Sequence, residues 1–409
     1  MARESSIPKG LFRETAVLYA RLAWRVFFSR EGSRPRPSPR RITVMAVFLP
    51  AFAMLEGLHW VAFWLDEILY PGFRRVEVRT PLFITGIPRS GTTLLHRVLA
   101  QDKNRYTWFT LWELVLAPAI VERKVIWGVA RLDRALGRPM SRLVNGIAAL
   151  GTRGLESVHK LALDEPEEDF LLLLPVLGCF ILVVAFPHDR EITGLAYFDE
   201  RIAPERRRRL MAFYKAMLQR HMYAHGTDRT LLSKNVSFTP LLGSLLETFP
   251  DCRIVACTRE PSSAVPSQIS AMKAGWRFFG NDTQTMAFRD RWVDLMRHYY
   301  ACQRDTLQVL PRDRAYLVDT ADLKTHLERE VGALYQAFGF DMSAEFATRL
   351  NEEAEQSRAF RSKHTYSMEG CGLDKEGIKH EFSELYANGQ DPRDRTPSGA
   401  GIAGSPGAL

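Results

Sequence analysis

The chain has 409 residues, which is enough for one large α/β domain with an extension or for two modest domains. Its composition, 46% hydrophobic and 25% charged, is that of an ordinary globular protein. The formal charge of +8 is compatible with an anionic small ligand or a membrane surface, but the cations form no stripe with interleaved aromatic residues, so we expect no nucleic-acid partner.

The five cysteines are odd in number and form no C-x-x-C pair, so we expect free thiols in a reducing compartment rather than disulfides or structural zinc. They are Cys179, Cys252, Cys257, Cys302 and Cys371. The N-terminal residues carry charges and a proline and lack the pattern of a cleavable signal peptide. We therefore expect a cytoplasmic protein.

Residues 1–70 are predicted to form a helical extension. Residues 11–29 have the pattern of a basic amphipathic helix, and a Pro- and Arg-rich linker follows them. The residues near the apolar face of this helix are Leu11, Thr15, Leu18, Leu22 and Val26.

Residues 42–70 are strongly apolar, although Pro50, Glu56 and His59 interrupt them. A membrane span needs about 20 apolar residues with few charges. We consider a helix packed on the protein's own core, a helix lying in a membrane interface, and a span, and we favour the first two. Because the basic linker would attract anionic lipid headgroups, peripheral association with a membrane, or anchoring in one, is left open.

Residues 71–390 are predicted to form the main domain, in which apolar strands alternate with helices. The strands are PLFITG (81–86), RTLLSK (229–234), CRIVACT (252–258) and RAYLVDT (314–320). The helices that follow them lie in residues 92–100, 240–249, 260–275 and 323–339. The alternation predicts an α/β fold, a P-loop-like three-layer sandwich with a central parallel sheet.

Two further segments of this chain have distinct compositions. The apolar run at residues 170–186 is broken by Pro175 and Gly178, and we predict buried core helices there, with the wall of an apolar acceptor cleft as the alternative. Residues 391–409 are rich in Pro, Gly and Ser without apolar periodicity, so we predict a disordered tail.

The segment GIPRSGTT (86–93) follows a predicted strand and opens a predicted helix. Successive backbone N–H groups in such a loop form an anion site, and the helix N-terminus adds partial positive charge. Gly86 and Gly91 permit the backbone conformation that the loop needs. Arg89 adds a planar cation that suits phosphate or sulfate oxygens. The remaining candidate ligands are the hydroxyl groups of Ser90, Thr92 and Thr93.

The loop differs from that of nucleoside triphosphatases, because Thr92 stands where the Walker pattern has a lysine. Among the predicted strand ends, Asp319 is only a weak candidate for the acidic partner that holds magnesium in those proteins. A P-loop kinase or NTPase is therefore an alternative that fits poorly.

The loop resembles the 5′-phosphosulfate-binding loop of sulfotransferases, in the branch with P-R-S-G-T-T that includes tyrosylprotein sulfotransferases and many bacterial enzymes. The resemblance covers about residues 65–390 and implies the donor 3′-phosphoadenosine 5′-phosphosulfate (PAPS). Arg259, at a strand end, and Ser267, eight residues later on the next helix, match the family's 3′-phosphate motif. The two motifs in this order predict one nucleotide site, since both lie at the carboxyl ends of strands.

The resemblance also implies the catalytic groups. Lys234 matches a lysine that precedes a helix in the family, and with Arg89 it would stabilise charge in the transition state. The branch uses a glutamate after the loop helix as the base, and Glu113 is our candidate. Its neighbours Trp108, Trp112 and Leu114 predict a raised pKa. The rival bases are Asp164, Glu167, Glu168 and His96, and the family's nucleotide-closing loop is assigned to Arg361, Lys363 or His364.

The sequence therefore predicts a sulfotransferase that acts on a small hydroxylated acceptor, with an apolar or lipid-like alcohol as the indicated class. No metal is expected, because protein cations would stabilise the leaving group. A non-catalytic nucleotide-binding membrane protein is the other alternative.

Overall fold

The structure is a computed structural model, and it describes residues 7–28, 38–137, 165–281, 285–359, 373–383 and 385. The predicted tail at residues 391–409 lies outside the described residues.

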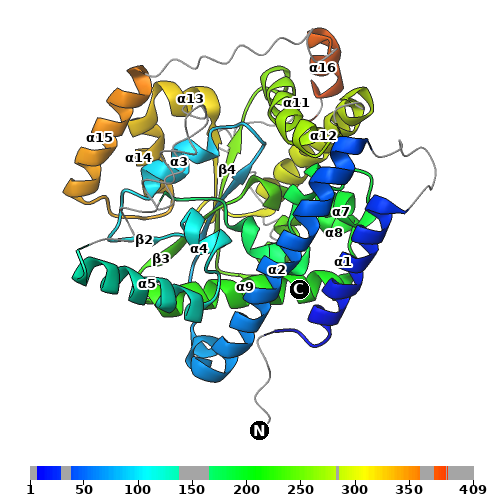
Figure 1. The fold of residues 1–409 in the computed structure, drawn as a ribbon. Helices are drawn as coiled ribbons and strands as arrows, with labels where there is room; N and C mark the ends of the chain where they lie inside the picture. The colour runs from blue at the N-terminus through cyan, green and yellow to red at the C-terminus, as the bar shows by residue number, and fades with distance from the viewer. Residues whose placement is uncertain are drawn as a thin grey trace, which may run out of the picture.

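Within these ranges five parallel strands form a sheet in the order β2-β3-β1-β4-β5 (Figure 1). The strands are β1 (Leu82–Gly86), β2 (Tyr106–Thr107), β3 (Thr230–Lys234), β4 (Arg253–Thr258) and β5 (Ala315–Asp319). Central β1 pairs Ile84 with Lys234 on one side and Gly86 with Cys257 on the other. These strands are runs of apolar residues because a parallel sheet is covered on both faces. The predicted α/β fold with a central parallel sheet is confirmed.

Helices cover both faces of the sheet and complete three layers (Figure 1). On one face, Leu82 and Ile84 share a hydrophobic cluster with α3 (Thr92–Leu99), α13 (Thr320–Thr325), α14 (Leu327–Ala337) and α15 (Ala344–Ala359). On the other, Phe83 belongs to a larger cluster with α9 (Pro204–His225), α10 (Leu242–Thr248), α11 (Pro261–Phe278) and α12 (Thr285–Val309).

Further helical elements occur along the described chain. They are η1 (Pro71–Arg75), α4 (Leu111–Val115), α5 (Ile120–Ala135), η2 (Asp169–Val176), η3 (Phe180–Val184), α7 (Arg190–Gly194), η4 (Leu195–Tyr197), α8 (Phe198–Arg201), η5 (Val236–Leu241) and α16 (Lys375–Glu381).

Two segments differ in detail from the prediction. The run at 170–186 is buried as expected, but it forms the short 3₁₀-helices η2 and η3, with Leu177 between them at φ 51°. The helix predicted over 323–339 is two helices, α13 and α14, because His326 between them leaves the helical region at φ −135°.

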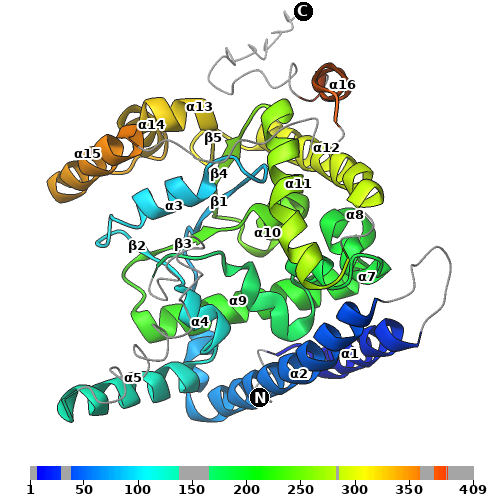
Figure 2. The same cartoon turned by 45° about the horizontal axis from the view of Figure 1, so that its top comes forward.

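The N-terminal helices α1 (Leu11–Phe27) and α2 (Pro39–Leu69) lie side by side along one edge of the molecule (Figure 2). The buried side of α1 contains Leu11, Leu18, Leu22 and Val26, as predicted, whereas Thr15 is half-buried. The Tyr19 hydroxyl donates to the Leu49 carbonyl of α2 at 2.6 Å.

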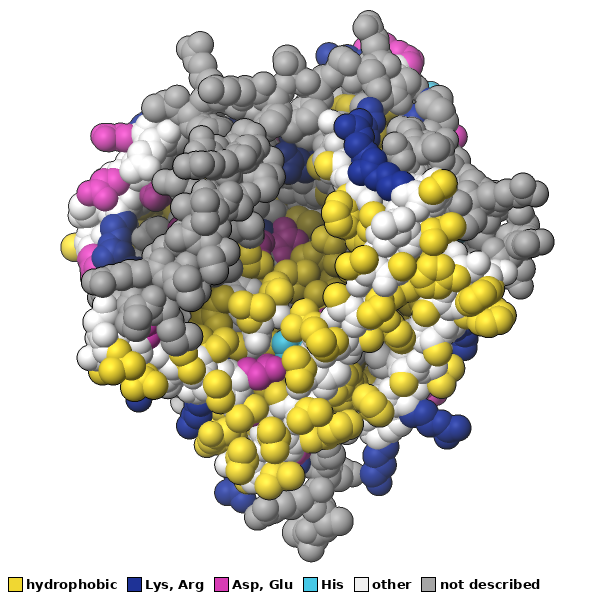
Figure 3. Space-filling view, viewed as in Figure 1, with side chains coloured by type: hydrophobic (Ala, Val, Ile, Leu, Met, Phe, Trp, Pro, Cys, Tyr) yellow, Lys and Arg dark blue, Asp and Glu magenta, His cyan; other side chains and the backbone are white. Residues whose placement is uncertain are grey.

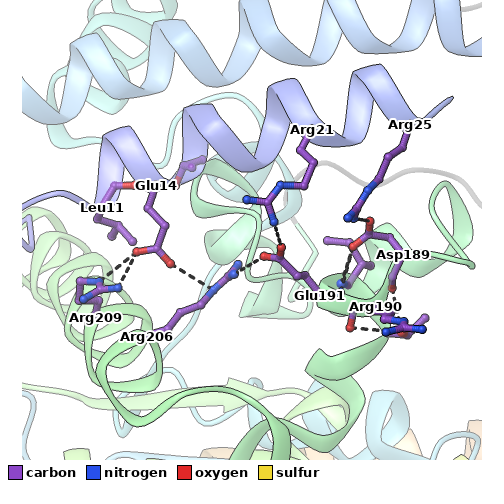
Figure 4. Close-up of polar contacts among 12 residues, drawn as sticks. Leu11, Glu14, Arg21, Arg25, Asp189, Arg190, Glu191, Arg206 and Arg209 are labelled. Carbon is purple, nitrogen blue, oxygen red and sulfur yellow. Dashed lines mark hydrogen bonds and ion pairs between the residues drawn. The ribbon is translucent and has the colours of Figure 1, made fainter. Parts of the chain in front are cut away.

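A network of ion pairs joins α1 to α7 and α9 (Figure 4). Glu14 contacts Arg209 at 2.7 Å and Arg206 at 3.4 Å. Arg206 also pairs with Glu191 at 2.8 Å, and Arg21 pairs with the same carboxylate. The basic side of the predicted amphipathic helix is therefore partly used to hold α1 on the domain.

Candidate active site

The loop between β1 and α3 has the backbone conformation that its glycines were expected to permit. Gly86 has φ 136°, and a Cβ there would lie 2.0 Å from the Cys257 carbonyl oxygen of β4. Arg89 and Gly91 also have positive φ, at 70° and 86°. Arg89 thus holds a conformation that is uncommon for a residue with a side chain, and such outliers concentrate at ligand sites.

Neighbouring elements hold the loop in place before any ligand binds. The Thr320 hydroxyl donates to the Ser90 carbonyl at 2.8 Å, and the Gly86 N–H donates to the Thr239 hydroxyl at 3.2 Å. The Ser90 hydroxyl is buried and has no hydrogen-bond partner within the described ranges. A buried hydroxyl of this kind calls for an acceptor, which an anion in the loop would supply.

The two predicted anion motifs meet in space. Arg89 Nε donates to Ser267 Oγ at 3.2 Å, and Arg259 Nη1 donates to the Arg89 carbonyl at 3.1 Å. The Tyr300 hydroxyl donates to the Arg259 carbonyl and so fixes the strand end behind it. Arg89, Arg259 and Ser267 therefore form one site, although 170 residues separate the two arginines in the sequence.

A cavity of about 700 Å³ opens beside this site, lined by Arg259, Thr320, Lys324 and Lys379 among others. Burial lowers the pKa of Lys324, and the charges of Arg259 and Arg89 lower it further. Several cations thus crowd together where an anion would relieve their repulsion. The cavity also contains two carboxylates, but Glu260 accepts from the Ser262 hydroxyl at 2.7 Å and Asp319 accepts from the Ala321 N–H at 2.7 Å.

Lys324 and Lys379 are functional candidates that the sequence reasoning missed. Lys324 lies on the helix that follows β5, and the rule that ligands bind at the carboxyl ends of strands could have pointed to it. Lys379 lies on α16, after an undescribed stretch, and no pattern in the sequence singles it out.

Lys234 is almost fully buried at the end of β3, next to the loop helix. Its Nζ lies 3.4 Å from Thr93 Oγ1, 2.8 Å from Glu168 Oε1 and 3.7 Å from Glu167 Oε1. The structure thus brings the predicted lysine together with two of the rival carboxylates, and Glu168 retains 21% of its side-chain exposure.

Glu113 has different partners. Its Oε2 accepts from the Thr110 N–H and hydroxyl, both at 3.0 Å, and its Oε1 lies 2.6 Å from His225 Nε2 and 3.6 Å from Arg123 Nε. Burial alone would raise the pKa of Glu113, but the Arg123 charge and the His225 hydrogen bond outweigh burial and hold the pKa well below its usual range.

The expectation of a raised pKa at Glu113 is therefore wrong. The sequence showed only the tryptophans beside it along the chain, whereas Arg123 and His225 come from α5 and α9. The Glu113 side chain is only 1% exposed, and Thr110, Arg123 and His225, which contact its carboxylate, all lie outside the loop at residues 86–93.

Of the two remaining candidate bases, the structure describes His96 but not Asp164. His96 is buried on α3, where burial and then the charges of Lys234 and Arg97 keep its pKa well below 6.5, so it is packed as a neutral ring. Asp164 and the candidates of the closing loop, Arg361, Lys363 and His364, lie outside the described residues.

In the described part of the chain, Glu113, His221 and His225 form a group whose ligand atoms are close enough to hold a metal ion. Each already has a protein contact, since Glu113 faces His225 and Arg123, and His221 Nε2 lies 2.9 Å from the Thr107 hydroxyl. The fixed Arg123 charge at 3.6 Å opposes a divalent cation there.

Apolar surface surrounds a hollow on the face that carries α2, α4 and α5, and charged side chains are visible in its depth (Figure 3). Separately, Phe180 and Val183 from the run at 170–186 line a cavity of about 680 Å³ together with Trp276 and Trp292. This cavity shares no lining residue with the one beside Arg259. A role for the run as an acceptor wall stays a prediction.

Comparisons with known proteins agree with this geometry. The model of the sulfotransferase family matches residues 81–344. The omega-hydroxy-beta-dihydromenaquinone-9 sulfotransferases Stf3 of Mycobacterium bovis and Mycobacterium tuberculosis are each 26% identical over 279 residues, which are 66% of this chain and 66% of each relative, just under two thirds.

Two solved structures have a similar fold. Sulfotransferase STF9 from Mycobacterium avium superposes with a TM-score of 0.71 at 18% identity, covering 94% of this chain and 93% of that one. Sulfotransferase STF1 from Mycobacterium tuberculosis superposes with a TM-score of 0.61 at 20% identity, covering 92% and 94%.

Proposed function

This chain belongs to the sulfotransferase family, and from that premise we propose that it transfers a sulfuryl group from PAPS to the hydroxyl of an apolar, lipid-like acceptor. The observation that carries the proposal is the convergence of Arg89, Arg259 and Ser267 beside one cation-lined cavity. A doubly phosphorylated adenosine needs such a pair of anion sites, one for each end.

Donor binding is assigned to the loop and the strand end next to it. The loop amides, Arg89 and the hydroxyls of Ser90, Thr92 and Thr93 bind the 5′-phosphosulfate, because they lie at the N-terminus of α3, where the helix favours an anion. Arg259 and Ser267 bind the 3′-phosphate. Lys324 and Lys379 add charge at the cavity wall.

The transfer breaks the bond between sulfur and the bridging phosphate oxygen and forms a bond between sulfur and the acceptor oxygen. The electron pair leaves with 3′-phosphoadenosine 5′-phosphate, and the hydroxyl proton passes to a base. Arg89 and Lys234 stabilise the charge that develops on the leaving and equatorial oxygens, and the loop holds the reacting groups in line.

For the base, the geometry favours Glu168 over Glu113. A general base must reach the proton that it accepts, and Glu168 lies beside Lys234 and the loop helix with part of its surface open. Glu113 is enclosed, both of its oxygens have partners, and its low pKa makes it a weak base. Glu113 then holds His225 and Arg123 in position rather than taking the proton.

An apolar acceptor is supported by two observations. The named activity of the Stf3 relatives is on a menaquinone derivative, which is an apolar molecule with a hydroxyl. The hollow in Figure 3 has mainly hydrophobic walls with charged groups in its depth, as an apolar alcohol would require.

The proposal is tested by incubating the protein with sulfur-labelled PAPS and a panel of hydroxylated lipids, steroids, sugars and peptides. We expect label in the apolar alcohols, and no phosphoryl transfer when ATP replaces PAPS. Binding of 3′-phosphoadenosine 5′-phosphate without any transfer would favour the non-catalytic alternative. Transfer from ATP would favour the kinase alternative.

A further inference from the structure

Helix α2 has apolar residues on its exposed side as well as on its buried side. Along its exposed side from Ile42 to Leu69 there is no charged side chain, and Thr43 is the only polar one. At about 1.5 Å per residue this uncharged side is about 40 Å long. Its large exposed residues are Ile42, Val47, Met54, Leu58, Val61, Trp64, Leu65, Ile68 and Leu69.

From Arg41 onward, the charged residues and the histidine of α2 instead point into the protein. Arg41 donates to Asn281 Oδ1 at 2.8 Å, and His59 Nδ1 lies 2.8 Å from Glu122. Asp66 accepts from Arg220 at 3.0 Å. A surface helix of a protein surrounded by water has polar and charged residues on its outer side, and α2 has almost none there.

Neighbouring helices extend this surface. On α5, which packs against α2, the large exposed residues include Val125, Val129 and Leu132. On α1, the half-exposed ring of Phe12 packs edge-on against Trp60 and Trp64. Figure 3 shows the resulting band of hydrophobic side chains around the hollow. We call the exposed residues of α1, α2 and α5 the apolar face.

The exposed charged side chains on the elements of the apolar face and on η1 have one sign, and the exposed Glu77 just after η1 is paired with Arg79. Every exposed charged side chain on α1, α2, η1 and α5 is a cation. These are Arg13, Arg21, Arg40, Arg75, Lys124, Arg131 and Arg134, of which Arg21 also pairs with Glu191. Apolar residues bordered by cations match the composition of an anionic lipid surface, with headgroups at the rim and acyl chains beneath.

We propose that the apolar face binds the surface of an anionic phospholipid bilayer, with α2 lying along it. Among the described residues α2 is the one helix long and apolar enough to cross a membrane. A span would expose the buried pairs of Arg41, His59 and Asp66 to lipid, at a large cost for each. Lying flat, the helix keeps these pairs and buries only its uncharged side.

This arrangement also explains how an insoluble acceptor reaches the site, a point that rests on the proposed function. The hollow opens on the same side of the molecule as the apolar face (Figure 3). An apolar alcohol can therefore pass from the bilayer into the hollow without crossing water.

The test measures co-sedimentation of the full chain with vesicles, in the absence of donor. We use vesicles of phosphatidylcholine alone and of phosphatidylcholine with phosphatidylglycerol. We expect binding to the anionic vesicles that weakens with added salt. The variant carrying Leu58→Asp and Ile68→Asp should bind at least about tenfold more weakly, since two apolar contacts are replaced by charges.

The matched control is Val309→Asp on α12, because Val309 is 77% exposed and Ile68 is 73% exposed. The control should bind vesicles like the natural protein. All variants are checked by thermal unfolding and by binding of 3′-phosphoadenosine 5′-phosphate. Should the aspartate variant fail to fold, Leu58→Ser with Ile68→Ser replaces it.

Equal vesicle binding by the natural protein and the α2 variant would overturn the proposal. A dimer in light scattering that ignores vesicles would also overturn it, since a second copy would then cover the face. Vesicle binding without sulfuryl transfer leaves this inference standing and counts against the proposed function alone.

Discussion

Among single residues, Arg89 is the clearest indication of a ligand site. It is a non-glycine residue with φ 70°, and it joins the two anion motifs. Its carbonyl accepts a hydrogen bond from Arg259, and its Nε donates a hydrogen bond to Ser267. Contacts of both its backbone and its side chain thus hold Arg89 in the conformation with positive φ. Hydrogen bonds with two neighbouring threonines hold the rest of the loop in place.

Gly86→Ala tests the shape of this loop. The added Cβ would lie 2.0 Å from the Cys257 carbonyl oxygen, so β1 and β4 must separate. We expect a loss of stability on the order of 3 kcal/mol and loss of nucleotide binding. Thermal unfolding and calorimetry measure both.

Gly128→Ala on α5 is the control for that substitution, because a Cβ there has nothing within 4 Å. It should leave nucleotide binding unchanged and stabilise the helix by up to about 1 kcal/mol. A Gly86→Ala variant as stable as this control would contradict the described loop.

The base is tested by comparing Glu168→Gln with Glu113→Gln. We expect Glu168→Gln to lower kcat by about 10²- to 10⁴-fold with little change in nucleotide binding. Glu113→Gln should instead lower the unfolding temperature, because it removes the ion pair with buried Arg123. A normal kcat for Glu168→Gln together with a collapsed kcat for a stable Glu113→Gln would restore the sequence-based hypothesis.

At the scale of elements, the strands and the loop helix could be predicted because their signal is local. PLFITG and CRIVACT are continuous apolar runs, and they became β1 and β4. Strand β2 could not be predicted, since it has two residues and exists only through its pairing with β3. The break between α13 and α14 was missed because the apolar period continues across it.

The anion motifs could also be predicted from the sequence, whereas the side chains that surround each carboxylate could not. Glu113 and Glu168 both lie near apolar residues in the sequence, and only the packing of α5 and α9 decides that Arg123 reaches the first. Lys234 pairs with Glu168 because β3 ends beside the loop helix α3. That position follows from the strand order, which the sequence does not show.

The ion pairs between α1 and α9 can be tested by substituting Glu14. Glu14 joins two arginines of α9 and is 28% exposed, so solvent screens the pairs only in part (Figure 4). We expect Glu14→Ala to cost about 1 kcal/mol of unfolding free energy, and less in high salt.

The control for α1 is Glu345→Ala, which removes an exposed pair with Arg349 within one helix. It should cost no more than about 0.5 kcal/mol. Equal losses for the two variants would contradict a structural role for the network on α1.

At the scale of the whole molecule, the site is made from the carboxyl ends of the strands and its charge comes from the protein. Because Arg89, Lys234 and Arg259 supply the cations, we expect EDTA to leave sulfuryl transfer largely unchanged. Initial rates with and without chelator measure this. Strict dependence on added magnesium or zinc would contradict the account.

The molecule also presents two kinds of surface in different places. The cation-lined cavity next to Arg259 suits a charged, soluble donor, whereas the apolar face suits the bilayer that would contain an insoluble acceptor. The fold separates them, since the cavity lies among α11, α13 and α16 whereas the apolar face is formed by α1, α2 and α5.

The most direct measurement is a crystal structure with bound 3′-phosphoadenosine 5′-phosphate. We expect the 5′-phosphate to lie against the amides of Gly91 to Thr93, and the 3′-phosphate to lie within hydrogen-bond distance of Arg259 and Ser267. A nucleotide bound elsewhere, as in the cavity lined by Trp276 and Trp292, or one that leaves Arg259 without a phosphate contact, would contradict it.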